Sequence, residues 1–283
     1  MKSPIFPVIF LFDNGSLRAE STLSLRGVAE ALVARTGRRV EAVSLLHSSN
    51  VPAAELAGVP ARLLEPALAA FFEETPEADA VLLPLFFGPS KALVEYVPAR
   101  LASLKSRFPK ASFWLAPCLA DPVLGEERLA QMLADRVRDV VLRDANGGKP
   151  HVVLVDHGSP VETVTAVRNA LGGQLAKALG DEVAGVSVAS MERREGEAFA
   201  FNEPLLATAL RNPPTNRGTV VVALQFLSPG RHAGPGGDLA QICAAAESEN
   251  PALRTVMTAP LAADNRLIDI LVERLKQAST GRC

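Results

Sequence analysis

Two histidines stand in the turns that follow apolar stretches, and these stretches read as buried strands. His157 follows residues 152–156, and His232 follows residues 219–227 and a Ser-Pro-Gly-Arg turn. A short aliphatic run bounded by turn residues predicts a strand of a parallel sheet, and ligands bind at the carboxyl ends of such strands. Imidazoles bind divalent first-row metals and exchange protons near neutral pH. The pair therefore predicts metal binding or proton transfer, although either histidine alone is more often a hydrogen-bonded structural residue.

A carboxylate follows the strand-like stretch 183–189 and should reach the same edge of the sheet. This residue is Glu192, and it would complete a metal-binding set with His157 and His232. The alternative interpretation is a solvated loop acid, because charged residues continue through 193–197. Glycines beside both histidines permit tight turns and a close approach of a ligand to the backbone.

Four further residues are candidates for binding a ligand at this edge or at its equivalent in the first half of the chain: Ser159, Arg231, Lys91 and Arg18. Ser159 is also the natural N-cap of the helix that follows it, which is the more common role of such a serine. Lys91 and Arg231 hold equivalent positions and, with Arg18, would attract a polyanion. Simple solvation of each cation is the alternative.

The order of elements in the first half of the chain returns in the second half. Four short segments recur in the same order: 13–16 as 156–159, 43–44 as 186–187, 87–89 as 227–229, and 116–117 as 259–260. The pairs that begin at residues 13, 43 and 116 are each 143 residues apart, and the pair that begins at residue 87 is 140 residues apart. The series predicts two copies of one unit. Asn14 and Ala92 stand where His157 and His232 stand, so the first copy lacks the histidine pair.

Each copy alternates strand-like and helical stretches, which predicts an α/β protein with two tandem repeated domains. Each domain should contain a roughly four-stranded parallel sheet flanked by helices. In the first copy we expect strands at 8–12, 40–46, 80–87 and 112–115, and helices at 21–36, 61–74, 97–107 and 124–142. The polar segment 143–149 is the predicted linker, which gives domains 1–143 and 144–283. The loops of two such domains can face one cleft.

Composition limits the classes of function. The 283 residues are 48% hydrophobic and 21% charged with a net charge of -2, which indicates a folded, soluble protein and argues against nucleic-acid binding. We expect neither a signal peptide nor a membrane span. The three widely spaced cysteines, Cys118, Cys243 and Cys283, predict a reducing cytoplasm without a disulfide framework. No P-loop or GxGxxG motif suggests a nucleotide requirement. The oligomeric state is left open.

Around His157, Glu192 and His232 the chain resembles the class II tetrapyrrole chelatases, specifically the CbiX/SirB group of sirohydrochlorin cobaltochelatases and ferrochelatases. The matching segments are 153–159, Met191-Glu192, 201–204, and 226–232 with Asp238. The resemblance covers most of 151–275 and, more weakly, 5–140. Residues 193–200 look like an insertion relative to the family pattern.

The resemblance implies a chelatase-like fold whose second copy inserts a divalent metal ion, Co²⁺ or Fe²⁺, into sirohydrochlorin or a related tetrapyrrole, as in cobalamin or siroheme biosynthesis. It implies that His157 and His232 bind the incoming ion and accept pyrrole protons, that Glu192 assists, and that paired domains hold the macrocycle. Ni²⁺ suits the same donors. The metal is a substrate of this lyase-type reaction, and no nucleotide is expected.

Two other classes of function remain open from the sequence. A non-catalytic metal or tetrapyrrole carrier descended from a chelatase would explain the degenerate first copy. A generic nucleotide- or phosphate-binding α/β protein is disfavoured because a glycine-rich phosphate loop is missing.

Overall fold

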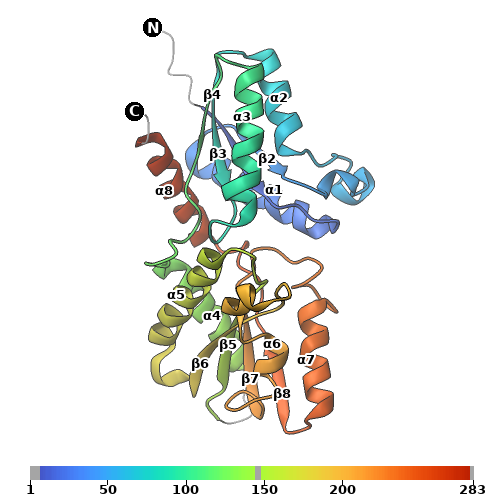
Figure 1. The fold of residues 1–283 in the computed structure, drawn as a ribbon, viewed down its shortest axis with the longest axis vertical. Coiled ribbons are helices and arrows are strands. Elements are labelled where there is room, and N and C mark those ends of the chain that lie inside the picture. The colour runs from blue at the N-terminus through green and yellow to red at the C-terminus, as the bar shows by residue number, and fades with distance from the viewer. Residues whose placement is uncertain (1–6, 144–147, 281–283) are drawn as a thin grey trace. The chain divides into compact units, whose positions relative to one another are not determined.

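The computed structural model describes residues 7–143 and 148–280, so residues 144–147 of the predicted linker and Cys283 lie outside the described residues. The chain divides into two compact units. Unit 1 contains residues 1–119 and 262–283, and unit 2 contains residues 120–261. Each unit holds one four-stranded sheet in which all neighbouring strands are parallel (Figure 1). The predicted α/β architecture of two repeated sheets is confirmed.

Unit 1 has the strand order β2-β1-β3-β4. Its strands are β1 (Val8–Asp13), β2 (Val40–Ser44), β3 (Asp79–Pro84) and β4 (Ser112–Leu115). Its longer helices are α1 (Ala19–Thr36), α2 (Leu64–Glu74), α3 (Val97–Arg107) and α8 (Arg266–Thr280). Helix α1 ends where the sequence predicts, because Gly37 adopts a left-handed conformation with φ of 64° and its N–H bonds the Val33 carbonyl.

Unit 2 has the equivalent strand order β6-β5-β7-β8. Its strands are β5 (His151–Asp156), β6 (Gly185–Ser190), β7 (Gly218–Leu224) and β8 (Leu253–Met257). Its helices are α4 (Glu127–Arg143), α5 (Glu162–Leu179), α6 (Leu206–Ala209) and α7 (Asp238–Glu249), and a short 3-10 helix spans Glu197–Asn202. The predicted site loops therefore follow the central strand β5 and its two neighbours, β6 and β7.

The compact units differ from the sequence halves 1–143 and 144–283 by the placement of two helices. Helix α4 ends the first half of the sequence, yet it packs on α5 and β7 of unit 2. Helix α8 ends the second half, yet it packs on α1 and β3 of unit 1. Each helix buries its apolar side against the sheet of the other repeat, a destination that amphipathic periodicity alone does not specify.

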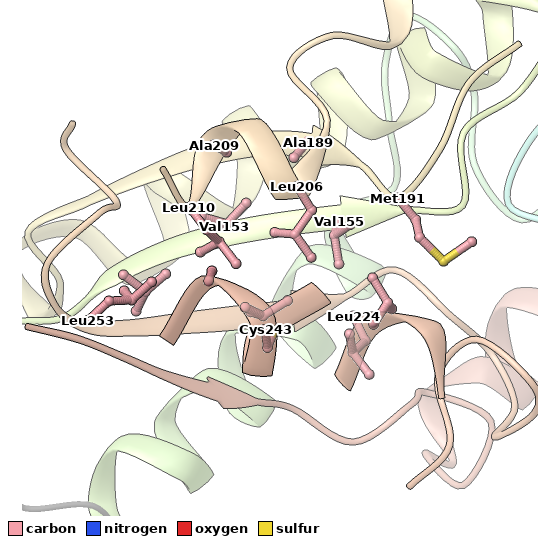
Figure 2. Close-up of a cluster of buried hydrophobic side chains, with 14 of the residues drawn as sticks. Val153, Val155, Ala189, Met191, Leu206, Ala209, Leu210, Leu224, Cys243 and Leu253 are labelled. Atoms are coloured by element: carbon pink, nitrogen blue, oxygen red, sulfur yellow. The ribbon is translucent and has the colours of Figure 1, made fainter. Parts of the chain in front are cut away.

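The core of unit 2 explains why β5 reads as an uninterrupted aliphatic run. Val153 and Val155 join a buried cluster with residues of α6 and α7, including Leu206 and Cys243 (Figure 2). The alternate residue Leu154 is also fully buried, because helices cover both faces of a parallel sheet. On that other face Gly172 of α5 is required, since a β-carbon there would lie only 2.4 Å from the Val188 side chain.

Backbone pairing corrects the sequence alignment of the two copies at the second strand. Asp13 pairs with Ser44, and Asp156 pairs with Ser190 rather than with Ser187. The repeat at 43–44 therefore corresponds to 189–190, because a chance Val-Ser dipeptide at 186–187 misled the comparison. The fourth anchor is also shifted by one residue, since the N–H of Ala116 bonds Leu82 as the N–H of Thr258 bonds Val222.

Among the described residues, no helix is long and apolar enough to cross a membrane. Cys118 and Cys243 are free thiols, and burial raises the pKa of the Cys118 thiol to about 11. Cys283 lies outside the described residues, and the cytoplasmic location stays a prediction.

We expect the stability of unit 1 to fall as the pH rises from about 4 to about 6. Burial raises the pKa of the Asp13 carboxyl from 3.8 to about 6, against hydrogen bonds from Ser44 and the backbone that lower it. In this interval the unfolded chain releases a proton that the folded chain retains, so the free energy of unfolding decreases by about 3 kcal/mol. Asp13→Asn removes this pH dependence.

Denaturant titrations monitored by Trp114, the single tryptophan, report on unit 1 because this residue lies in β4. Relative to the wild type, Asp13→Asn should gain about 3 kcal/mol of stability between pH 4 and pH 7. A difference between the two proteins that is the same at both pH values would contradict the assignment of this slope to Asp13.

Candidate functional site

The first histidine is held by a tight turn at the end of β5. His157 follows Asp156 directly, and Gly158 adopts a φ of 89° that side-chain-bearing residues rarely take. The N–H of Gly158 bonds Asp156 Oδ1 at 3.2 Å, and a β-carbon on Gly158 would lie 1.9 Å from the carbonyl oxygen of Glu192. The turn after β5 therefore lies directly against the turn after β6. The predicted position of His157 at a strand's carboxyl end is confirmed.

The second histidine is held by a compact glycine-rich loop between β7 and α7. The N–H of Asp238 bonds the carbonyl of Arg231, and the N–H of Leu239 bonds that of His232. Gly237 is required because a β-carbon there would lie 2.5 Å from the Arg231 carbonyl oxygen. Asp238 is the first residue of α7, and its Oδ2 lies 2.6 Å from Nδ1 of His232. The loop therefore fixes the backbone of His232, and the Asp238 side chain at the start of α7 fixes its ring.

The two imidazoles meet at the carboxyl edge of the sheet. Their ring centroids are 4.7 Å apart with an interplanar angle of 80°, so one ring presents its edge to the other. Glu192 Oε1 lies 3.6 Å from Nε2 of His157. The side chains of His157, His232 and Glu192 are 46%, 30% and 62% exposed. The structure therefore brings the three residues together with faces left open for a ligand.

Hydrogen bonding determines which nitrogen of each neutral ring carries a lone pair. Nδ1 of His157 lies 3.1 Å from the Gly158 carbonyl, which can only accept, so Nδ1 donates. Nδ1 of His232 likewise donates to the Asp238 carboxylate. Both Nε2 atoms then carry lone pairs. Because Nε2 of His157 and Oε1 of Glu192 are two acceptors facing one another, they favour a cation between them, either a proton or a metal ion.

The arrangement stops short of a closed metal cage. Across residues 7–143 and 148–280, no group of three or more His, Cys, Asp or Glu side chains is placed to hold a metal ion as it stands. The ligand set of His157, His232 and Glu192 therefore remains a proposal. The open faces of these side chains leave room for water and for a substrate molecule in the remaining coordination positions.

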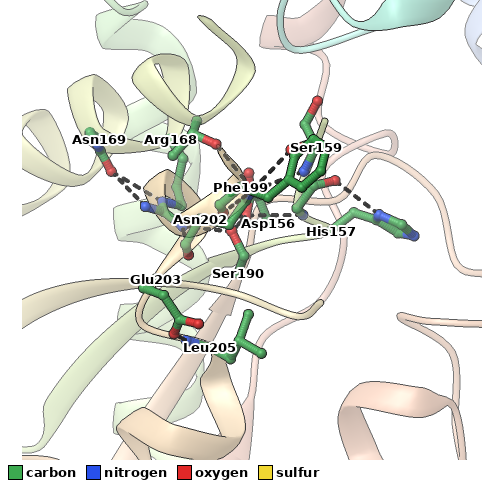
Figure 3. A network of polar contacts seen from close by, with 12 residues as sticks. Asp156, His157, Ser159, Arg168, Asn169, Ser190, Phe199, Asn202, Glu203 and Leu205 are labelled. Atoms are coloured by element: carbon green, nitrogen blue, oxygen red, sulfur yellow. Dashed lines mark hydrogen bonds and ion pairs between the residues drawn. The ribbon is translucent and has the colours of Figure 1, made fainter. Parts of the chain in front are cut away.

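A buried polar network lies beneath the His157 turn (Figure 3). Ser190 Oγ donates to Asp156 Oδ1 at 2.6 Å, and Arg168 Nη1 donates to Ser190 Oγ at 2.6 Å and to the Asn202 carbonyl at 2.9 Å. The guanidinium of Arg168 also lies 3.8 Å from Asp156 Oδ1. Burial raises the pKa of the Asp156 carboxyl, while Ser190 and Arg168 oppose that rise. The network joins the ends of β5 and β6.

The predicted substrate-binding residues have different surroundings. Ser159 is buried, and its hydroxyl accepts the N–H of Val161, which is itself the N-cap of α5. The prediction that Ser159 caps the helix is therefore wrong, because the helix begins three residues later. Arg231 is 76% exposed and lies 3.5 Å from Asp238. The roles of these side chains toward a substrate stay predictions.

The other two predicted substrate-binding residues belong to unit 1. Arg18 is the exposed N-cap of α1, and its backbone N–H bonds Ser16 Oγ. Lys91 forms an ion pair with Glu95 at 3.4 Å. Lys91 also lines a pocket of about 390 Å³ on unit 1. Unit 1 therefore keeps a concave surface beside one of the two predicted cations.

This pocket occupies the position that corresponds to the histidine site of unit 2. The N–H of Leu46 bonds the Asn14 carbonyl just as the N–H of Glu192 bonds that of His157. Leu46 is thus the counterpart of Glu192, and Asn14 and Ala92 are the counterparts of the two histidines. All three counterparts line the pocket. The first copy therefore has an amide and two apolar groups where the second copy has its two histidines and Glu192.

Comparison with known proteins identifies the second repeat. The CbiX family model matches residues 151–278. This segment is a CbiX domain. It contains His157, Glu192 and His232, and its last helix is α8. None of the curated proteins compared with the chain matches it.

The fold of the whole chain is that of two solved SirB structures. SirB from Bacillus subtilis with Fe3+ shares 13% sequence identity with a TM-score of 0.69, and the match covers 98% of both chains. The sirohydrochlorin chelatase SirB from Bacillus subtilis subspecies spizizenii, in complex with cobalt, shares 13% identity with a TM-score of 0.68, covering 98% of this chain and 96% of that one. The resemblance to CbiX/SirB-like class II chelatases is confirmed by the family match and this shared fold.

Sequence reasoning overlooked three residues that hold the CbiX site in shape. Asp238 appeared only as part of a matching segment, although its position at the first turn of a helix six residues after His232 was an available signal. The sequence contains a weaker signal for Arg168 and Asn202. Arg168 lies in a helix whose other charged residues, Glu162 and Lys177, are exposed, so nothing in the sequence distinguishes it as a buried side chain.

Proposed function

We propose that the CbiX domain inserts a divalent metal ion, Co²⁺ or Fe²⁺, into sirohydrochlorin or a closely related tetrapyrrole. The observation that carries the proposal is the edge-to-face pair of His157 and His232, 4.7 Å apart at one sheet edge. Two imidazole Nε2 atoms and a nearby carboxylate suit these ions and also Ni²⁺. The metal ion is a substrate, so an open site that releases it fits the reaction better than a closed structural cage.

The same residues can handle the protons of the reaction. Two pyrrole N–H protons must leave the macrocycle as one divalent ion enters. When the ion leaves the Nε2 atoms of His157 and His232, their lone pairs become free to accept these protons. The Asp238 carboxylate, 2.6 Å from Nδ1 of His232, stabilises the imidazolium that results. Glu192, 3.6 Å from His157, provides a further acceptor.

Exposed cations would recognise the peripheral carboxylates of the tetrapyrrole. Arg231 lies next to His232 and is largely exposed, so it is suited to bind an acidic side chain of a macrocycle above the histidine pair. Lys91 and Arg18 are proposed to bind acidic groups at the surface of unit 1. Ser159 supports the His157 turn in this account, because its N–H and carbonyl both bond the Asn202 amide.

The carrier alternative is separated from catalysis by counting turnovers. With sirohydrochlorin and Co²⁺ in large excess over protein, we expect product absorbance to rise far beyond one equivalent at a rate proportional to protein concentration. A reaction without protein corrects for spontaneous insertion. Product or bound metal that stops at one equivalent would overturn the catalytic proposal and favour a carrier. Repeating the assay with Fe²⁺ and Ni²⁺ ranks the metals by kcat/KM.

A further inference from the structure

The two copies differ beneath their active edges as well as at them. Helices α1 and α5 have the same length and occupy the same place in their units, so Leu25 corresponds to Arg168. Both side chains are only 1% exposed. The copy with the histidine pair therefore buries a guanidinium at a position where the copy without histidines buries a leucine. Burying a charged group costs free energy, so a purely apolar core would favour the leucine.

Among the described residues, the Arg168 guanidinium contacts only the segments next to the two turns of the site and Asn169, its neighbour in α5. Nη1 holds Ser190 and the Asn202 carbonyl, while Nε and Nη2 bond Asn169 Oδ1 at 3.1 and 3.0 Å. Ser190 stands two residues before Glu192. Asn202 in turn accepts the N–H of Ser159 at 2.9 Å, two residues after His157. Arg168 thus links the segments that carry both residues (Figure 3).

Unit 1 fills the same space with smaller neutral groups. The hydroxyl of Ser48 replaces the Asn202 amide, since it accepts the N–H of Ser16 at 3.2 Å and donates to Ser44 Oγ at 2.9 Å. The turn itself is retained, because Gly15 has a φ of 87° and lies against Leu46. The turn therefore forms without an arginine, and the guanidinium must add something that an apolar copy does not need.

We infer that Arg168 is a positioning residue of the CbiX domain, which holds the turns carrying His157 and Glu192 at the separation that the metal ion requires. This inference rests on the proposed function for its role in the reaction. The mechanism is geometric: a planar fork with fixed donor directions bonds the end of β6 and the 197–202 segment at once. A displacement of about 1 Å in either turn is enough to lower a rate about 100-fold.

The test replaces Arg168 by the residue that its counterpart uses. Arg168→Leu should lower kcat for metal insertion about 10–100-fold while KM for the tetrapyrrole changes less than twofold. Arg168→Lys, which keeps the charge without the fork, should recover only part of the rate. The control is Arg211→Leu, which removes an exposed arginine paired with Glu249 in the same unit and should change kcat less than twofold.

A second variant separates positioning from folding. Arg168→Leu leaves Asp156 buried without its cation, so the double variant Arg168→Leu/Asp156→Asn should regain a wild-type melting temperature while its kcat stays low. Positioning is overturned if either variant inserts metal at more than half the wild-type rate.

A measurement without metal or substrate separates this inference from the proposed function. The rings of His157 and His232 are close enough for a nuclear Overhauser effect between their protons in the wild type. The effect should persist in Arg211→Leu and vanish in the folded double variant. If the wild type inserts no metal, the proposed function fails, and the ring contact still decides the role of Arg168. A ring contact that is unchanged in the double variant overturns it.

Discussion

Replacing either histidine by alanine is expected to abolish most of the metal-insertion activity. His157→Ala and His232→Ala should each lower kcat/KM by about 10²–10⁴-fold, because each removes one metal ligand and one proton acceptor from the same edge. Both side chains are partly exposed, so the melting temperature should change little. The measurement is the initial rate of product absorbance with Co²⁺ and sirohydrochlorin.

The matched controls are the two histidines that lie elsewhere. His151→Ala changes the first residue of β5, at the opposite end of that strand from His157. His47→Asn changes an exposed residue of unit 1. Both variants should retain at least half of the wild-type rate. If His157→Ala and His232→Ala also retain it, the histidine pair has no part in the reaction and the proposed mechanism fails.

Replacing Gly158 by alanine adds one methyl group and is expected to disrupt the candidate site by displacing its two turns. A β-carbon there would lie 1.9 Å from the Glu192 carbonyl oxygen, and the φ of 89° is unfavourable for alanine. Gly158→Ala must therefore push the β5 and β6 turns apart, which separates His157 from Glu192. We expect insertion to fall about 100-fold and unit 2 to lose at least about 2–3 kcal/mol of stability.

Gly15→Ala is the matched change in unit 1, where a β-carbon would lie 1.7 Å from the Leu46 carbonyl oxygen. It should destabilise unit 1, as reported by Trp114 fluorescence, and leave amide-exchange protection of β5 unchanged. Gly158→Ala should lower the protection of β5. Gly173→Ala serves as a neutral control, because nothing lies within 4 Å of its added β-carbon. Full activity in a folded Gly158→Ala protein would contradict the packing of the two turns described above.

Much of the fold follows from periodicity, and the errors have physical causes. The helix at 97–107 and the strand at 112–115 have the bounds that the sequence predicts. Several strands end earlier than predicted because the apolar runs continue into buried loops. Leu45 and Leu85, for example, are each 4% exposed yet lie beyond β2 and β3. An apolar run reports burial, and burial does not stop where hydrogen bonding between strands stops.

The site was predictable only where it depends on strand order. His157 and His232 follow the neighbouring strands β5 and β7, so parallel pairing alone brings them to one edge. The Asp238 contact depends on the fold of a glycine-rich loop, and the Arg168 network depends on a helical residue that faces inward. The spacing of Asp238 from His232 was nevertheless a signal, whereas packing of the kind that buries Arg168 leaves no fixed spacing in the sequence. The packing of α4 and α8 on the sheets of the opposite repeats could not be predicted for the same reason as the burial of Arg168.

Metal binding by the histidine pair is tested most directly with a crystal of the full chain soaked in Co²⁺ and measured at the cobalt absorption edge. We expect one anomalous peak at about 2.1 Å from Nε2 of both His157 and His232, with Glu192 turned toward it. Cobalt bound only at other residues, or bound by one of these rings while the other points away, would contradict the claim that this edge receives the metal.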